Sequence, residues 1–170
     1  PEETLEQAYQ QLKDEVANEL LHLVKGNTPE FFEKLVVHLI VAMGYGGSVK
    51  DAGKATRKTA DEGIDGVIKE DRLGLDAIYL QAKRWEVVVG RPEIQKFVGA
   101  LHGQRAKKGV FITTSRFSKE ALDYVGQIDP KVVLIDGTDL VQLMIDHGVG
   151  VSSAAVYEVK KVDTDFFIED

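Results

Sequence analysis

At 170 residues the chain has the length of one domain, and a domain of that length buries roughly 70% of the surface that its unfolded chain exposes. Its 44% hydrophobic and 29% charged residues are typical of a globular protein, and the lack of cysteine excludes a disulfide scaffold, a thiolate metal site and a cysteine nucleophile. No apolar run approaches the roughly 18 residues of a membrane span and no signal peptide opens the sequence, so we expect a cytoplasmic protein.

Charge is divided unevenly along the chain, whose net charge is −7. Residues 50–116 carry 14 Lys and Arg against 9 Asp and Glu, a net charge of +5. The remaining residues carry 7 against 19, a net charge of −12. The basic middle is compatible with one cationic face that binds an anion, and equally with lysines scattered over a solvated surface.

The first predicted element is a helix over residues 4–24. Its large apolar residues recur at steps of three and four and form one narrow stripe: Leu5, Tyr9, Leu12, Val16, Leu20 and Leu23. The spacing is close to that of a heptad repeat. The stripe therefore either docks on its own domain or pairs with another chain.

Alternating strands and helices follow. Thr28 and Pro29 open a helix over about 29–43, and Ser118 is the expected N-cap of a helix over 118–125. Further helices are predicted at 92–106 and 138–146, and strands at 64–69, 77–83, 109–114 and 131–135. The glycine-rich, charged segment 44–62 is expected to be a mobile loop, and no element is predicted for 148–170. A hairpin followed by strand–helix alternation predicts an α/β fold with a mixed sheet flanked by helices.

Three familiar kinds of site find little support. Five residues separate Gly47 from Gly53 where a phosphate-binding loop has four, and Ala55 stands where Ser or Thr would bind magnesium. Ser115 lacks the G-x-S-x-G turn of a serine hydrolase. The histidines fall on separate predicted helices without metal-ligand spacing and are expected to be structural or surface residues: His22, His38, His102 and His147.

One group of polar residues points to chemistry. Asp65 lies where a loop enters a predicted strand, between glycines that allow a ligand or a phosphate backbone to approach closely. Gln81 and Lys83 lie two residues apart on the next strand, so their side chains share a face. If the two strands form a hairpin, a carboxylate, an amide oxygen and an ammonium group meet at one place.

A hard divalent cation takes a few oxygen ligands and keeps several waters, and a lysine beside it can orient or deprotonate one of them. These are the components of metal-assisted phosphodiester hydrolysis, although a buried polar pair in a sheet explains the same residues. Glu33 lies at the edge of the apolar face of its helix, where a carboxylate is costly unless it is paired or serves a cation. It is either a further ligand, a base beside the ligands or a solvated glutamate.

Six blocks of sequence together resemble the catalytic domain of Mrr-type restriction endonucleases, which belong to the PD-(D/E)xK nuclease superfamily. The blocks run in order within residues 29–150: Phe32-Glu33-x-Leu-Val, Gly44-Tyr45-Gly46, Asp61-x-Gly-Ile-Asp65-Gly, Gln81-Ala-Lys83-Arg84, Val89-Gly90-Arg91 and Gly109-Val-Phe-Ile-Thr-Thr-Ser. The resemblance implies a restriction-endonuclease-like core, with a central mixed sheet of four or five strands flanked by helices, and here an extra N-terminal helix. It also implies DNA cleavage that depends on Mg²⁺ or Mn²⁺.

The resemblance assigns roles to four residues. Asp65 and Lys83 match the motif aspartate and lysine, and Gln81 stands where most of the superfamily has Glu or Asp, a substitution typical of the Mrr branch. Glu33 matches the carboxylate of the first core helix. The implied metal ligands are Asp65, Gln81, the Ala82 backbone carbonyl and Glu33. Because a glutamine is neutral, we expect weak Mg²⁺ binding until DNA phosphates complete the coordination shell.

Enzymes of the Mrr type are type IV restriction endonucleases, which act on methylated foreign DNA and are thought to recognise it through a separate N-terminal domain. The resemblance divides this chain into a connecting helix at 1–28, the catalytic domain at 29–150 and a tail at 151–170. We expect duplex DNA as the partner, a C2 homodimer because two strands are cut, and neither a nucleotide cofactor nor a membrane. The candidate phosphate contacts are Lys54, Arg57, Lys58, Arg84 and Arg91.

Two other functions fit the same core. One is a structure-specific nuclease for junctions or repair, and the other is a DNA-binding module that keeps the fold without turnover. Ser115 and Arg116 follow a predicted strand and either touch DNA or cap the next helix, and we favour the cap.

Overall fold

The computed structural model describes residues 1–46 and 63–169. The predicted mobile loop at 44–62 lies almost entirely outside this range, whereas every other predicted helix and strand is present close to its predicted bounds. The elements are α1 (Glu2–Lys25), α2 (Pro29–Ala42), β1 (Gly66–Lys69), β2 (Ala77–Lys83), α4 (Arg91–Gly103), β3 (Lys108–Thr113), α5 (Lys119–Val125), β4 (Lys131–Ile135), α6 (Gly137–Asp146) and a short 3₁₀ helix, η1 (Thr164–Phe167).

The strands form one mixed sheet in the order β1-β2-β3-β4. β1 and β2 are an antiparallel hairpin, while β2, β3 and β4 run parallel to one another. Parallel neighbours need a crossover, and α4 and α5 provide the two crossovers. The predicted mixed sheet is therefore confirmed, with four strands among residues 1–46 and 63–169.

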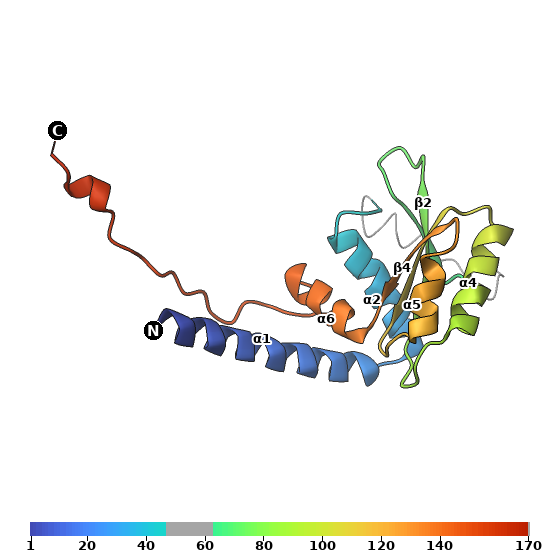
Figure 1. Ribbon diagram of the computed structural model, residues 1–170, viewed down its shortest axis with the longest axis horizontal. Coiled ribbons are helices and arrows are strands. Elements are labelled where there is room, and N and C mark those ends of the chain that lie inside the picture. Colours follow the sequence, from blue (N-terminus) through green and yellow to red (C-terminus); the bar gives the residue numbers. More distant parts are fainter. Residues whose placement is uncertain (47–62, 170) are drawn as a thin grey trace.

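Helices cover both faces of this sheet (Figure 1). On one face the side chains of Ile78, Leu80 and Ile112 pack with α1, α2 and α6. On the other face Phe111 and Val132 pack with α4 and α5. Since successive strand residues point to opposite faces, this division tells us on which face each residue of β2 lies.

Short polar caps set where the helices begin. The Thr28 hydroxyl accepts a hydrogen bond from the backbone N–H of Phe31, and the Ser118 hydroxyl accepts one from Ala121. Both side chains satisfy a backbone donor that has no partner within its helix. The predicted N-caps are confirmed, so Ser118, not Ser115, caps the helix that follows β3.

The apolar stripe of α1 points mostly away from the domain. The helix packs on α6 through a different row, with Ala17, Leu20 and Val24 buried. Only Leu20 belongs to the predicted stripe, and its other members are exposed: Leu5, Tyr9, Leu12, Val16 and Leu23. Ala17 is small, which permits close approach of α1 to its neighbour. The prediction considered only large apolar residues and therefore did not include Ala17.

The segment after α6 carries little regular structure. Residues 151–169 run away from the sheet and contain only η1 (Figure 1). Apolar side chains of this segment are exposed, among them Tyr157 and Phe166. Within residues 1–46 and 63–169 no helix is long and apolar enough to cross a membrane.

Candidate active site

Asp65 lies immediately before β1, at the end of the hairpin that is remote from its turn. Its backbone N–H donates to the Leu80 carbonyl at 2.7 Å, which continues the β1–β2 ladder by one bond. Its carboxylate Oδ2 accepts a hydrogen bond from the backbone N–H of Ala82 at 2.7 Å. The carboxylate is thus fixed against β2. The N–H and C=O of one strand residue point to the same side, so the Ala82 carbonyl is directed toward the same edge.

Gln81 and Lys83 share the face of β2 opposite to Ile78, Leu80 and Ala82. Gln81 is 3% exposed. Its Oε1 atom is buried and has no hydrogen-bond partner within the described part of the chain. An unsatisfied buried oxygen lowers the stability of the folded chain by on the order of 1–3 kcal/mol. This atom is therefore a candidate ligand for a cation.

Burial raises the pKa of the Asp65 carboxyl above its ordinary value. The hydrogen bond from Ala82 and the positive charge of Lys83 both act in the opposite direction and lower that pKa, but desolvation is the largest effect. Lys83 is therefore close enough to Asp65 to stabilise its charged form. Its Nζ also lies over the Trp85 ring, 5.6 Å from the centroid. A cation at Asp65 would relieve the cost of burying the carboxylate.

Comparison with known sequences identifies the family. Residues 24–144 match the Mrr_cat family, described as restriction endonuclease. The chain belongs to this family. It is also 48% identical over 167 residues to the "Type IV methyl-directed restriction enzyme EcoKMrr" of Escherichia coli (strain K12), an alignment that covers 98% of this chain and 54% of that protein. The chain thus spans about half the length of this relative.

Solved structures show that the Mrr_cat chain has a restriction-endonuclease-like fold. It superposes on the "DNA modification-dependent restriction endonuclease AspBHI" with a TM-score of 0.61 and 21% identity, covering 78% of this chain and 36% of that one. The structure entitled "MspJI Restriction Endonuclease in Complex with 27-mer Oligonucleotide" gives a TM-score of 0.54 at 21% identity, over 78% of this chain and 31% of that one. The predicted fold class is therefore confirmed.

Among the Mrr motif residues, the structure brings Asp65, Gln81 and Lys83 together. Glu33 is half-buried on α2, which packs on the opposite face of β2 from Gln81 and Lys83. Within the described ranges no three His, Asp or Glu side chains form a metal-binding group, and the four histidines are exposed. The part of Glu33 in metal binding stays a prediction.

The five candidate phosphate contacts have different surroundings. Lys54, Arg57 and Lys58 lie outside the described residues. The Arg84 guanidinium donates from Nη1 to the Lys25 carbonyl at 2.9 Å, where α1 ends, and its Nε is buried. The exposed Arg91 lies over the ring of Tyr124, 4.8 Å from its centroid. Arg84 thus joins α1 to the end of β2, and DNA contacts of all five residues stay predictions.

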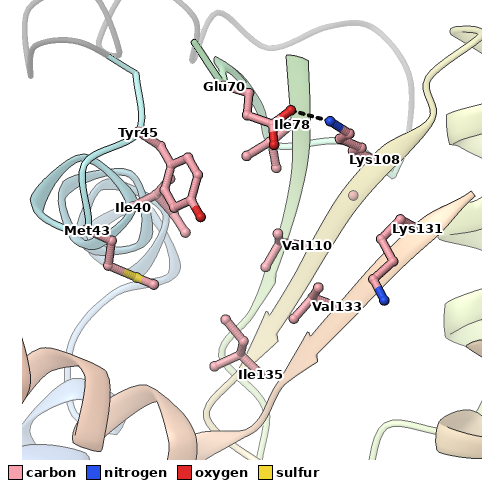
Figure 2. A pocket seen from close by; sticks show the side chains of 11 residues that line it. Ile40, Met43, Tyr45, Glu70, Ile78, Lys108, Val110, Lys131, Val133 and Ile135 are labelled. Atoms are coloured by element: carbon pink, nitrogen blue, oxygen red, sulfur yellow. Dashed lines mark hydrogen bonds and ion pairs between the residues drawn. The ribbon is translucent and has the colours of Figure 1, made fainter. Parts of the chain in front are cut away.

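One cavity among the described residues lies away from these motif residues. A cavity of about 260 Å³ opens between the C-terminal end of α2 and the sheet, with Met43 and Tyr45 facing Val110 and Val133 (Figure 2). None of Asp65, Gln81 or Lys83 lines it. The motif residues are therefore not part of this cavity.

Three polar residues near the site were missed by sequence reasoning. Thr113 and Thr114 are 0% and 2% exposed at the end of β3, and Trp85 lies beside Lys83. Their signal in the sequence is weak: two hydroxyl residues close an otherwise apolar strand. Ser115 follows them, and its hydroxyl donates to the Val87 carbonyl at 2.6 Å.

Proposed function

We propose that this chain is the cleavage domain of a type IV restriction endonuclease, which hydrolyses phosphodiester bonds of modified duplex DNA with Mg²⁺ or Mn²⁺. The observation that carries the proposal is the Oε1 atom of Gln81, which has no partner among the described residues, near the half-buried carboxylate of Asp65. Membership in the Mrr_cat family supports the reaction class. The relative's name, which describes it as a methyl-directed restriction enzyme, supports modified DNA as the substrate. We propose defence against foreign DNA, in the cytoplasm, as the role.

The donor set fits a hard divalent cation. Asp65, Gln81 and the Ala82 carbonyl offer three oxygens at one edge of the sheet, and Glu33 is the proposed fourth ligand. A bound Mg²⁺ would polarise the scissile phosphate and acidify a water molecule. Gln81 contributes a carbonyl oxygen without charge, so the four residues together carry two negative charges and not three. We propose that the phosphates of DNA supply the missing negative charge.

The protein side chains have distinct tasks in this reaction. The Asp65 carboxylate, fixed by the N–H of Ala82, orients the ligands at the edge of β2. Lys83 Nζ is on the same strand face as Gln81 and can hold the attacking water or accept a proton from it. Phosphate contacts from Arg91, Arg84 and the three basic residues of 54–58 would position the backbone of DNA without reading its bases. Binding should therefore weaken steeply as salt rises.

Plasmid cleavage tests the proposal. The 170-residue chain would be incubated with methylated and unmethylated supercoiled DNA in Mg²⁺ or Mn²⁺, beside Lys83→Ala and the exposed control Lys119→Ala on α5. We expect nicking by the parent chain and by Lys119→Ala, and none by Lys83→Ala. DNA binding without nicking in either metal would contradict the proposal and favour a binding module. Preference for branched over methylated duplex DNA would favour the structure-specific nuclease.

We also propose a C2 homodimer, because one site per chain cuts one strand. The exposed face of α1 supports this: Leu12 is 62% and Tyr9 66% exposed on a helix of 24 residues. Leu12→Asp should sediment as a monomer and should nick plasmids without linearising them. Leu73→Asp is the matched control, since Leu73 is 83% exposed in the hairpin turn. A parent chain that sediments as a monomer at all concentrations would refute the dimer.

A further inference from the structure

Three consecutive hydroxyl side chains at the end of β3 bind the segment that leaves β2. We call them the hydroxyl ladder. Its three bonds run from Thr113 Oγ1 to the Lys83 carbonyl (2.8 Å), from Thr114 Oγ1 to the Trp85 carbonyl (2.9 Å) and from Ser115 Oγ to the Val87 carbonyl (2.6 Å). The three consecutive hydroxyls therefore bond the carbonyls of every second residue of the segment, at positions 83, 85 and 87.

The two threonine hydroxyls of the hydroxyl ladder are deeply buried. Thr113 is 0% and Thr114 2% exposed, directly after the apolar residues Phe111 and Ile112. Valine has nearly the same shape as threonine, and at these buried positions it would leave no polar atom in need of a hydrogen bond. A buried hydroxyl is tolerated because it is hydrogen-bonded, so these bonds account for the presence of threonine.

The Lys83 carbonyl is the most heavily bonded point of the hydroxyl ladder. It accepts from Thr113 Oγ1, from the backbone N–H of Thr114 at 3.3 Å and from the backbone N–H of Trp85 at 3.1 Å. The bond from Trp85 spans two residues and turns the chain sharply at Arg84. The backbone of Lys83 and Trp85, and hence the direction of both side chains, is fixed by these donors.

The donor side of the hydroxyl ladder is itself held rigidly. The backbone N–H of Gly137, at the start of α6, donates to the Ser115 carbonyl at 2.8 Å. A Cβ at Gly137 would lie 2.3 Å from the Thr114 carbonyl oxygen, so α6 packs on the end of β3 with no room for a side chain. A rigid donor strand can impose its geometry on the segment that it binds.

We propose that Thr113 and Thr114 are positioning residues for the proposed nuclease reaction, which hold the Lys83 ammonium over Trp85 and in line with Asp65 and Gln81. The inference rests on the proposed function for its catalytic part. Its geometric part does not, because Trp85 is the only tryptophan of the chain and reports on its own contact with Lys83.

The test compares Thr113→Val with Thr113→Ser, which keeps the hydroxyl, and with Thr138→Val, an exposed threonine on α6. For Thr113→Val we expect kcat to fall about 10- to 100-fold with little change in KM, since small displacements of a reacting group cost that much. Thr113→Ser should retain most of kcat. Thr138→Val should equal the parent.

Fluorescence of Trp85 tests the position of the Lys83 side chain independently of its part in catalysis. Lys83→Met removes the ammonium group from the indole ring, and Thr113→Val should shift the emission in the same direction. In the Lys83→Met background Thr113→Val should cause little further shift. Equal kcat and equal emission for Thr113→Val and parent would overturn the positioning role. If the parent does not cleave, the proposed function fails, and the emission of Thr113→Val then decides the geometric claim alone.

A folding defect is also distinguishable from a positioning defect. Thermal melting is recorded for each variant, and Ser115→Ala serves as the milder substitution because Ser115 lies at the less buried end of the hydroxyl ladder. If Thr113→Val unfolds, Thr114→Val takes its place in the same comparison. A loss of kcat in Thr114→Val without an emission shift would overturn the proposal.

Discussion

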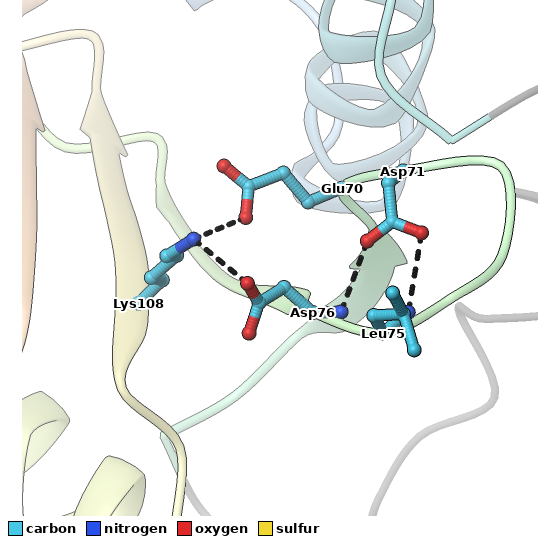
Figure 3. Close-up of polar contacts among 5 residues, drawn as sticks. All are labelled: Glu70, Asp71, Leu75, Asp76 and Lys108. Carbon is cyan, nitrogen blue, oxygen red and sulfur yellow. Dashed lines mark hydrogen bonds and ion pairs between the residues drawn. The ribbon is translucent and has the colours of Figure 1, made fainter.

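The carboxyl groups at the two ends of the β1–β2 hairpin have pKa values that are shifted in opposite directions. At the turn, the Asp71 carboxylate accepts hydrogen bonds from the backbone N–H groups of Leu75 and Asp76 (Figure 3) and from that of Leu73. These bonds, the one from Leu75 most of all, hold the pKa of Asp71 below its ordinary value. At the other end, burial raises the pKa of Asp65. One strand pair thus carries a carboxylate that stabilises the folded chain and one that folding penalises.

The neighbours of these two carboxylates follow the same contrast. Near the turn, Lys108 is bonded to Glu70 and lies 3.2 Å from Asp76, so one cation pairs with two carboxylates (Figure 3). At the other end the Gln81 Oε1 atom has no partner within the described residues. The groups at the turn satisfy one another without a ligand, whereas the end at Asp65 has, within the described residues, an unsatisfied acceptor near a half-buried carboxylate. The second pattern is typical of a functional site.

The substitutions Asp65→Asn and Asp71→Asn should show the largest difference between the two ends of the hairpin, in both DNA cleavage and stability. Asp65→Asn removes a proposed metal ligand, and we expect DNA cleavage to fall by on the order of a thousandfold or more, while the melting temperature at pH 7 stays equal or rises. Asp71→Asn should keep full cleavage and melt at a lower temperature. Plasmid cleavage rates and thermal melts of both variants check this. Cleavage retained by Asp65→Asn would disprove its role.

Gln81, the proposed neutral ligand, allows a second test of the difference between the two ends of the hairpin. Gln81→Glu adds a carboxylate beside Asp65, which should destabilise the metal-free chain because two like charges share a buried edge. Mg²⁺ affinity without DNA should rise about tenfold, since a charged oxygen attracts the cation more strongly. Calorimetric titration with Mg²⁺ and melts with and without metal measure both effects. An unchanged affinity would show that Gln81 is not a ligand.

The pH dependence of stability should have opposite signs at the two ends. The raised pKa of Asp65 means that its charge costs stability at neutral pH, and that this cost disappears as pH falls through that pKa toward the ordinary value of 3.8. The lowered pKa of Asp71 provides stability above 3.8 that is lost as pH falls further. Melts of both asparagine variants from pH 3 to 8 should therefore converge on the parent from opposite sides.

The smallest change in stability and cleavage is expected for Lys108→Met. The change leaves Glu70 and Asp76 without their cation, but both are at the surface of the hairpin turn, where such pairs contribute little. We expect a small decrease in melting temperature that shrinks at high salt, and unchanged cleavage. Cleavage that fell with this variant would mean that the two ends of the hairpin are coupled.

Local pattern was a good guide to the elements and a poor guide to polar partners. The hairpin over β1 and β2 and the common face of Gln81 and Lys83 follow from a period of two, which any strand obeys. The bond from Arg84 to the Lys25 carbonyl, 59 residues away, was not predicted, and a DNA contact of Arg84 stays a prediction. Ser115 was expected to cap a helix and bonds Val87. Nothing in the neighbouring sequence shows which distant carbonyl a hydroxyl or guanidinium will meet.

The sequence by itself determined the order of helices and strands, the Mrr resemblance and the candidate site residues on β1 and β2, because periodicity, caps and motif spacing are local properties. Only the tertiary structure decided that the α1 stripe faces outward, that the Gln81 oxygen has no partner in the described part of the chain and that Thr113 bonds the Lys83 carbonyl. Each of these depends on which surfaces and backbone groups packing brings together, and packing is set by the whole chain.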